Sequence, residues 1–214
     1  MTAMTSDRMR EAPMPLPLIR GERVFLRPAE RDDLPRFVRW LNDADNAQYL
    51  SIRSPMSLPM EEKWFETMLA AQGRSDYHFV ICLVEDETPI GTIGLHGISW
   101  DNGDAAVGIA IGEKAFQGRG LGTDAMNAIV DFAFGELRFA RVELDVYAFN
   151  ARAERSYQKA GFTHEGTMRE AHVHHGQHVD VHRMSILRDE WDALPRRRGW
   201  ELATRSSDPS TADG

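Results

Sequence analysis

The alternation of apolar and polar positions predicts a chain rich in β-strands. Between 141 and 149 the apolar residues Val142, Leu144, Val146 and Ala148 alternate with polar ones, which is the period-two pattern of a strand with one buried face. Apolar runs bounded by turn residues predict the other strands: a short strand at 23–27, a hairpin of strands at 77–84 and 90–98, a strand at 105–111, and a final hairpin within 171–187.

Helical spacing of apolar residues separates several of these strands. Asp32 and Asp33 are expected to start the first helix, and Gly161 is expected to end the last one in a left-handed conformation. Helices are predicted from about 32 to 41, from 59 to 71, after residue 121, and from 151 to 160. A helix between the strands at 105–111 and 141–149 implies that these two strands run parallel. The pattern therefore predicts an α/β (α+β) domain with a mixed, mostly antiparallel sheet and one parallel pair.

Length and composition fit one domain. The chain has 214 residues, of which 42% are hydrophobic, enough to bury a core. Residues 1–18 are rich in Met, Pro and charge and lack the apolar segment of a signal peptide, so we expect a disordered leader there and a cytoplasmic protein. We place the domain at 19–194 and a flexible tail at 195–214. The single cysteine, Cys82, lies in an apolar run and is expected to be a buried small hydrophobe.

The charge balance bears on partners. The net charge is −8, which argues against nucleic acid, because phosphate binding is driven by basic surface. We expect no membrane partner, and a homodimer is left open. An acidic surface weakly favours a cationic substrate. Asp32, Asp33, Asp43 and Asp45 could attract a polyamine, although solvated helix caps are the commoner role of such residues.

The run Gln-Gly-Arg-Gly-Leu-Gly-Thr at 117–123 follows a predicted strand and opens a predicted helix. Its glycines allow sharp turns that direct several N–H groups at one point, where the helix N-terminus adds positive charge, so we expect an anion cradle that suits a pyrophosphate. A Walker loop would need Gly-Lys-Ser/Thr at its end. A dinucleotide fingerprint would need a third glycine where Thr123 stands.

The spacing Gln-x-x-Gly-x-Gly resembles the coenzyme A pyrophosphate loop of the GNAT family of N-acetyltransferases. About thirty residues downstream, Asn150, Tyr157 and Gly161-Phe162 are similar to a second segment of that family. The resemblance covers roughly residues 20–194 and is strongest to the branch of ribosomal-protein N-terminal acetyltransferases and spermidine acetyltransferases. It implies that the two parallel strands splay apart and that acetyl-CoA threads the gap. It also implies transfer of acetyl to a primary amine, without a metal.

The resemblance places the cofactor-binding residues. The pyrophosphate would lie on Gln117, Gly118, Arg119, Gly120, Leu121, Gly122 and Thr123. Main-chain N–H groups of Ile109, Ala110 and Ile111 would face pantetheine and the thioester carbonyl, because a strand that loses its neighbour leaves such groups free. Asn150 would contact the pantetheine arm, although its position also suits the N-cap of the next helix.

The catalytic acid and base are predicted with unequal support. Tyr157 shares a helical face with Ala153 and Ala160, which by pattern alone favours a core tyrosine. The resemblance instead puts Tyr157 at the position of the general acid, and a phenol can protonate a leaving thiolate. Related enzymes often carry a glutamate where this chain has Ala-Val-Gly at 106–108. His96 is the remaining candidate base, beside a water relay, although a structural histidine is the commoner role.

Five histidines flank Gly176-Gln177 in the last predicted hairpin: His172, His174, His175, His178 and His182. With a two-residue loop His174 would pair with Val179 and the cluster would split, whereas a three-residue loop would align His172, His174 and His178 with Asp180 and His182. We expect no metal there and place the histidines at the edge of the acceptor pocket.

The acceptor amine stays open at this stage. A polyamine or similar small cationic amine and the N-terminal α-amine of a ribosomal protein are nearly equal alternatives. A non-catalytic acyl-CoA-binding sensor is the rival of another class. Such a sensor would keep the glycine loop but would not need Tyr157, so the tyrosine favours an enzyme.

Overall fold

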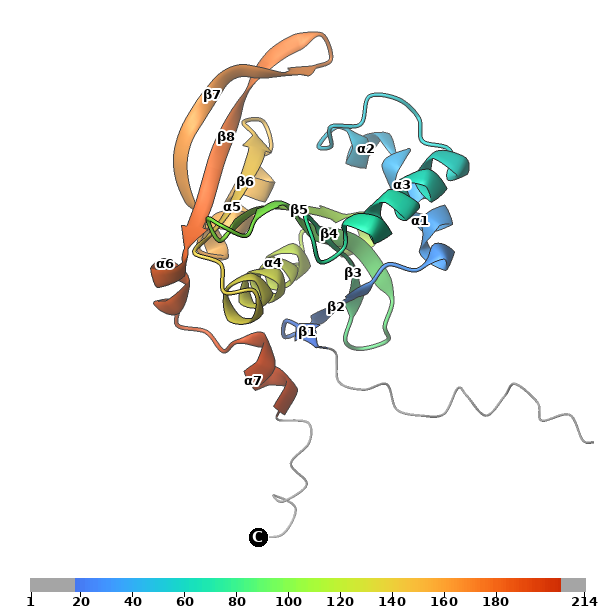
Figure 1. Ribbon diagram of the computed structural model, residues 1–214. Helices are drawn as coiled ribbons and strands as arrows, with labels where there is room; N and C mark the ends of the chain where they lie inside the picture. The colour runs from blue at the N-terminus through green and yellow to red at the C-terminus, as the bar shows by residue number, and fades with distance from the viewer. Residues whose placement is uncertain (1–17, 205–214) are drawn as a thin grey trace, which may run out of the picture.

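The computed structural model describes residues 18–204, and within them eight strands form one sheet in the order β1-β2-β3-β4-β5-β6-β8-β7 (Figure 1). The first four strands are β1 (Ile19–Arg20), β2 (Val24–Pro28), β3 (Tyr77–Leu83) and β4 (Pro89–Ser99). The other four are β5 (Asp104–Ile111), β6 (Arg141–Tyr147), β7 (Thr163–His174) and β8 (Gln177–Leu187).

Only β5 and β6 run parallel within this sheet, and they stay paired over a short stretch. The pairing joins Asp104 to Arg141 and ends where Ala106 meets Glu143. Beyond that point β5 continues to Ile111 bonded to β4 alone, while β6 continues to Tyr147 bonded to β8 alone. The predicted parallel, splayed pair is therefore confirmed, and a gap opens in the middle of the sheet.

Seven α-helices cover the described part of the sheet. They are α1 (Leu34–Leu41), α2 (Ala44–Ala47), α3 (Leu58–Ala71), α4 (Leu121–Asp131), α5 (Ala151–Lys159), α6 (Arg188–Asp192) and α7 (Gly199–Thr204). A π-helical turn, Phe132–Glu136, continues α4. None of the described helices has the length and apolar character needed to cross a membrane.

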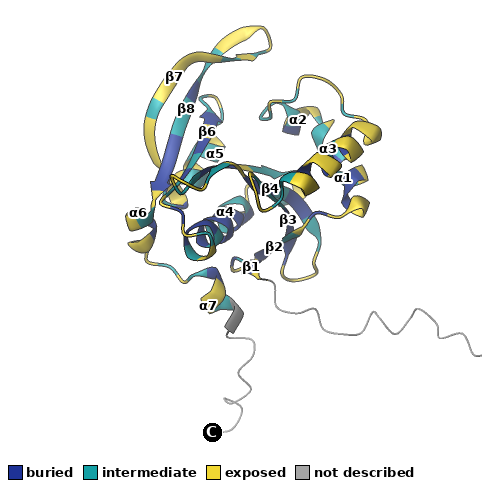
Figure 2. Ribbon diagram, viewed as in Figure 1, coloured by how far each residue is buried: buried dark blue, intermediate teal, exposed yellow. Residues whose placement is uncertain are grey.

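Two hydrophobic cores lie on opposite faces of the central strands, as the alternation along β2 requires. Val24 and Leu26 join the larger core with the apolar face of α4, whereas Phe25 joins the smaller core under α1 and α3. Cys82 is fully buried in the smaller core, and burial raises the pKa of its thiol. The expected role of Cys82 as a small core residue fits this placement. Figure 2 shows the buried strands and α4 between more exposed outer segments.

Two predicted boundaries differ from the observed ones. Asp32 and Asp33 belong to a 3₁₀ turn, Arg31–Asp33, and the α-helix begins only at Leu34. The Glu30 N–H donates to the Asp33 carboxylate at 3.0 Å, and the Asp33 N–H donates to the Glu30 carbonyl at 2.9 Å, so these two residues close the turn ahead of the helix. The final hairpin starts at Thr163 and not near 171, because most of β7 is exposed and carries little of the apolar alternation that marks a half-buried strand.

The segment that begins at 195 was predicted to be a flexible tail, but its described part is folded. Asp131, at the end of α4, is almost fully buried and accepts hydrogen bonds from Arg196 at 2.7 and 2.8 Å and from the Gly199 N–H at 2.8 Å. The Trp191 indole N–H donates to the same carboxylate at 2.8 Å. These bonds hold α7 against the domain. Residues 205–214, and residues 1–17 of the expected leader, lie outside the described residues.

Candidate active site

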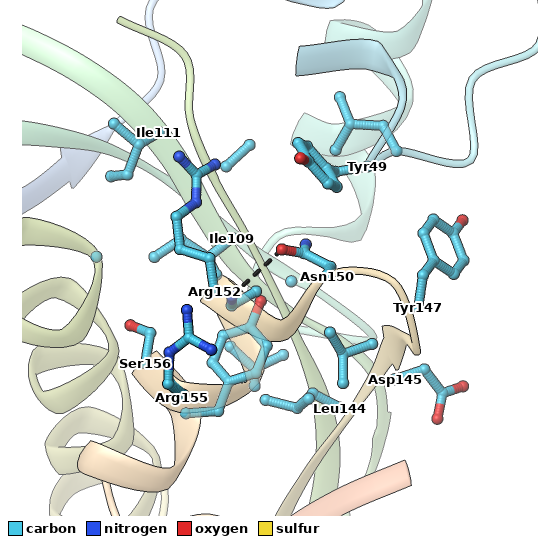
Figure 3. A pocket seen from close by; sticks show the side chains of 18 of the residues that line it. Tyr49, Ile109, Ile111, Leu144, Asp145, Tyr147, Asn150, Arg152, Arg155 and Ser156 are labelled. Atoms are coloured by element: carbon cyan, nitrogen blue, oxygen red, sulfur yellow. Dashed lines mark hydrogen bonds between the residues drawn. The ribbon is translucent and has the colours of Figure 1, made fainter. Parts of the chain in front are cut away.

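The gap between β5 and β6 opens into a cavity of about 810 Å³. Its walls come from β5, the glycine loop, β6, the start of α5 and the β7–β8 hairpin. Figure 3 shows Arg152, Arg155 and Ser156 along one side of this cavity and Asp145 and Tyr147 along the other. A ligand threaded through the sheet here would touch both faces.

The glycine loop has the backbone that an anion cradle needs. Gly118 and Gly120 adopt φ values of +73° and +78°, a region that side chains rarely enter. The Arg23 guanidinium donates to the Arg119 carbonyl at 2.7 Å and fixes the loop from outside. The first helical bond of α4 runs from the Asp124 N–H to the Gly120 carbonyl at 3.1 Å.

Helix geometry leaves the N–H groups of residues 121–123 without partners inside α4. They lie where the helix dipole is positive, which favours a phosphate. Thr123 also exchanges a hydrogen bond with Ser156 of α5 at 2.7 Å, so the loop and α5 form one wall. The cradle expected at 117–123 is thus geometrically in place.

Gln117 locks the cradle to the end of β5. Its amide donates to the Ile111 carbonyl at 2.8 Å and to the Asn46 amide oxygen at 2.9 Å. Its own oxygen accepts from Arg152 at 3.1 Å. Gln117 therefore positions the loop and an arginine through one side chain, and it need not touch a phosphate to matter.

Basic residues of α5 border the same end of the cavity, and our sequence reasoning did not identify them. Arg152, Arg155 and Lys159 are exposed and line the cavity, as Gly118 and Gly120 do, and Figure 3 shows the first two of these basic side chains. Their spacing of three and four residues puts them on one helix face, and that spacing was the available signal. This positive patch suits a polyanion on a protein whose net charge is −8.

Asn150 takes the role of a helix cap and also borders the cavity. Its side chain accepts a hydrogen bond from the Ala153 N–H at 3.2 Å (Figure 3), as an N-cap does. Ile109, Ala110 and Ile111 line the opposite wall of the cavity. The two readings of Asn150 are therefore compatible.

Tyr157 borders the cavity from α5 and packs against the larger core beside Phe162. No hydrogen-bond partner for its hydroxyl is found among residues 18–204. Burial raises the pKa of Tyr157 to about 12, because the charged phenolate is poorly solvated there. The phenol therefore keeps its proton and has a free O–H to donate.

His96 lies at the exposed end of β4, where its backbone pairs with Ala106. It lines the cavity on the face of the sheet that carries α1 and α3. Its ring approaches Gly108 so closely that a Cβ added there would stand 3.4 Å from Cε1. The only histidine predicted near the reaction centre thus does face the cavity.

The polar face of β6 contributes a group that sequence reasoning missed. Glu143, Asp145 and Tyr147 line the cavity together with Arg183 of β8. Arg183 donates two bonds to Asp145 at 2.9 and 3.0 Å and lies 3.6 Å from Glu143. The polar positions of the 141–149 alternation were the available signal, because side chains on that face of the strand point away from the larger core.

Stacked rings close the cavity above this polar face. Tyr147 stacks on His172 with centroids 3.9 Å apart, and Phe149 stacks on His174 at 4.4 Å. Tyr49 follows Phe149 at 6.0 Å. These contacts join the hairpin tip to the segment after α2, which Figure 1 shows facing the hairpin across the open end of the gap.

The observed hairpin register matches neither predicted alternative. The turn consists of His175-Gly176, so His174 pairs with Gln177 and His172 with Val179. His172 and His174 therefore share one face of the ribbon, and His178 lies on the other, beside Val173. His175 and Gly176 take positive φ values of 47° and 77°, as both central residues of a type I′ hairpin turn do, and histidine is among the residues that tolerate this region.

The acidic residues proposed for a polyamine are mostly occupied. Asp33 is buried and paired with Arg27 at 2.7 Å and Arg36 at 3.1 Å. Lys114 bridges Asp43 at 2.9 Å and Asp45 at 2.6 Å. Among residues 18–204, no group of three or more His, Cys, Asp or Glu side chains is arranged to hold a metal ion.

A splayed parallel pair, a glycine loop at the N-terminus of the next helix and a half-buried phenol beside the gap are the arrangement expected of an acyltransferase that uses a coenzyme A thioester. The sequence profile described as an Acetyltransferase (GNAT) domain matches residues 23–163. The chain therefore belongs to the GNAT family of N-acetyltransferases.

Relatives and solved structures agree with this family. The spermidine N(1)-acetyltransferase of Vibrio cholerae is 30% identical, over 80% of this chain and 96% of that protein. The putative ribosomal N-acetyltransferase YdaF of Bacillus subtilis is 32% identical over 51% of this chain and 60% of its own length. A spermidine N-acetyltransferase from Vibrio cholerae, crystallised with CoA and spermine, superposes with a TM-score of 0.73 at 25% identity, covering 79% of this chain and 98% of that one. The protein is an N-acetyltransferase with acetyl-CoA as its co-substrate.

Proposed function

We propose that the protein acetylates a primary amine by direct transfer, with both substrates held in the gap between β5 and β6. The observation that carries this proposal is the alignment, along one cavity, of the glycine loop, the end of β5 that has left β6, and Tyr157. Acetyl-CoA supplies an activated acyl thioester to that cavity. The lone cysteine is buried away from it, so no thiol of this chain is available to carry the acetyl group.

The protein's own groups divide the work along the cavity. The N–H groups at 121–123, with Arg152 and Arg155, hold the phosphates. Main-chain N–H groups of Ile109–Ile111 orient the pantetheine arm and stabilise the thioester oxygen as it gains charge. Tyr157 donates its proton toward the sulfur as negative charge develops there. The raised pKa keeps this proton in place until then.

His96 is proposed to take the proton that the attacking amine loses, directly or through a water molecule. It faces the cavity from the acceptor side, and imidazole can accept a proton near neutral pH. Glu143 and Asp145 also line the cavity, but their carboxylates are already engaged in ion pairs with Arg141 and Arg183, so neither is the proposed base. An alkyl amine with a pKa of about 10.4 needs such a base more than an α-amine of about 7.7–8.0.

The acceptor is proposed to be a small primary amine. Tyr49 and Tyr147 line the cavity, where aromatic rings attract a cationic group, and a relative is named for spermidine. The N-terminal α-amine of a ribosomal protein is the second candidate, because YdaF carries that name. The buried thiol further fits a reducing, cytoplasmic setting.

A substrate screen tests this proposal. Release of free CoA is followed with polyamines, aminoglycosides, amino acid amides and N-terminal peptides, each at saturating acetyl-CoA. We expect turnover with at least one small amine and a weaker response to peptides. Binding of acetyl-CoA without turnover of any amine would favour the sensor alternative.

A further inference from the structure

A second, smaller cavity of about 220 Å³ adjoins the first on the face of the sheet beneath α1 and α3. Its floor is the sheet, where His78, Thr92, Gly94 and His96 stand on neighbouring strands. Its roof is Phe37 and Trp64 of the two helices, together with Ala29 and Leu50. We name this space the side cavity.

The side cavity exists because the sheet carries very small residues at its floor. Gly94 pairs with Gly108, and Thr92 pairs with Ala110. A Cβ at Gly94 would stand 2.5 Å from the Tyr77 carbonyl, so this position has no room for a side chain. Above this floor, α1 and α3 place the rings of Phe37 and Trp64, which pack against each other.

Those rings form a rigid roof. Trp64 meets Phe37 edge to face at 6.3 Å and meets the His78 ring at 5.4 Å. Such edge-to-face contacts are favourable and hold each ring in place. The space beneath is therefore a preformed apolar pocket, the kind of site that recognises ligand groups by shape.

The side cavity is joined to the acceptor end of the active-site cavity. Leu50, His96 and residues 108–110 line both spaces. Those residues of β5 are paired with β4 but no longer with β6, and they overlap the stretch proposed to hold the thioester. A group seated in the side cavity is therefore attached close to the amine that reacts.

We propose that the side cavity is a specificity pocket, and that the preferred acceptor is a primary amine carrying one branched aliphatic or phenyl-sized group near its nitrogen. The inference rests on the proposed function and deepens it, since it names the class of amine. An apolar occupant fits the roof of Phe37, Trp64, Ala29 and Leu50, while the polar side chains of the lining, His78, Thr92 and His96, all lie on the floor. Burial lowers the pKa of His78, so the histidine beside Trp64 is neutral and adds no charge.

A matched set of α-amines tests the proposal, because their amine pKa values are similar. Glycinamide, leucinamide and phenylalaninamide are compared by kcat/KM from CoA release. Filling an apolar pocket next to a reaction centre changes kcat/KM on the order of ten- to a hundredfold. We expect leucinamide and phenylalaninamide to exceed glycinamide by that factor.

Thr92→Phe fills the side cavity from its floor, since Thr92 lines the side cavity and not the larger one. The variant should remove the advantage of the two bulky amines. Its turnover of glycinamide should stay within about twofold of the wild-type value, because glycinamide has no side chain to enter the side cavity. Thr92→Ser is the matched control and should keep the preference. Trp64→Leu instead enlarges the side cavity at its roof and should shift the preference toward phenylalaninamide over leucinamide. This second variant tests the proposal where Thr92→Phe does not fold.

The outcomes separate this inference from the proposed function. Equal kcat/KM for all three amides, or a preference that survives Thr92→Phe in folded protein, overturns the specificity pocket while acetyl transfer stands. If no amide is turned over, calorimetric titration of phenylalaninamide and glycinamide into CoA-saturated protein decides the inference alone. Tighter binding of phenylalaninamide that Thr92→Phe abolishes supports the pocket, and equal binding overturns it.

Discussion

At the scale of single residues, environment decides what each side chain can do. Tyr157 sits on an apolar helical face, as a core residue would, yet its hydroxyl reaches a cavity and has no partner among the described residues. Gln117 has no charge, yet it ties the glycine loop to β5 and to Arg152. Both roles depend on neighbours brought from distant parts of the chain.

Tyr157→Phe is expected to lower kcat by about 10²- to 10⁴-fold, the range of general acid catalysis, and to leave acetyl-CoA affinity nearly unchanged. The ring still packs, and only the proton donor is lost. Turnover is measured where chemistry limits the rate, and coenzyme affinity is measured by titration. A variant with wild-type kcat would show that Tyr157 is a core residue and that the acid lies elsewhere.

Gly120→Glu is expected to abolish the rise in melting temperature that acetyl-CoA causes, because a carboxylate would enter the phosphate cradle. Ligand at a hundredfold excess over its Kd stabilises the folded state by about 2.7 kcal/mol. Gly176→Glu is the matched control, since Gly176 has nearly the same φ, +77° against +78°, but lies at the hairpin tip. Equal ligand shifts in the two folded variants would contradict the loop assignment.

At the scale of elements, the β7–β8 hairpin is attached to the sheet through charges as well as backbone pairing. Glu165 of β7 accepts bonds from Arg141 of β6 at 2.6 Å and from Ser185 of β8 at 2.7 Å. The Arg141 guanidinium, with help from Ser185, lowers the pKa of Glu165 to about 2. This one carboxylate therefore links three strands beside the cavity.

The pH dependence of stability should reveal this link. A carboxylate with a depressed folded-state pKa stabilises the fold above its unfolded value of about 4.3, and the contribution is lost as pH falls toward 2. We expect the stability gap between wild type and Glu165→Gln to be largest above pH 5 and to shrink between pH 4.5 and 2. Urea unfolding at several pH values measures it. A gap that does not vary with pH would show that the ion pair contributes no stability.

At the scale of the whole molecule, the two faces of the sheet carry different tasks. The face under α4 and α5 holds the glycine loop and Tyr157, the proposed cofactor cradle and acid, whereas the face under α1 and α3 holds His96 and the side cavity. The gap between β5 and β6 connects the two faces. The segment after 195 closes the domain over the end of α4.

Ending the chain after Leu194 is expected to destabilise the domain by about 3–5 kcal/mol, because Asp131 would stay buried after losing its charged partner Arg196. The melting temperature and urea midpoint measure the change. A chain that ends after Thr204 keeps α7 and serves as the control. If both truncations melt like the full chain, α7 adds nothing to stability and residues from 195 act as the tail first predicted.

The sequence by itself determined the family and most of the strands and longer helices. Local alternation marked β6, glycines with a helix behind them marked the cradle, and the spacing of Asn150 and Tyr157 marked the second motif, because each signal depends on neighbours within a few residues. Only the tertiary structure decided what depends on distant pairings. It placed Arg183 beside Asp145, buried Asp131 under Arg196 and set a hairpin turn at His175-Gly176. The side cavity also required it, since a floor of glycines on β4 and β5 becomes a pocket only when Phe37 and Trp64 form a roof over it.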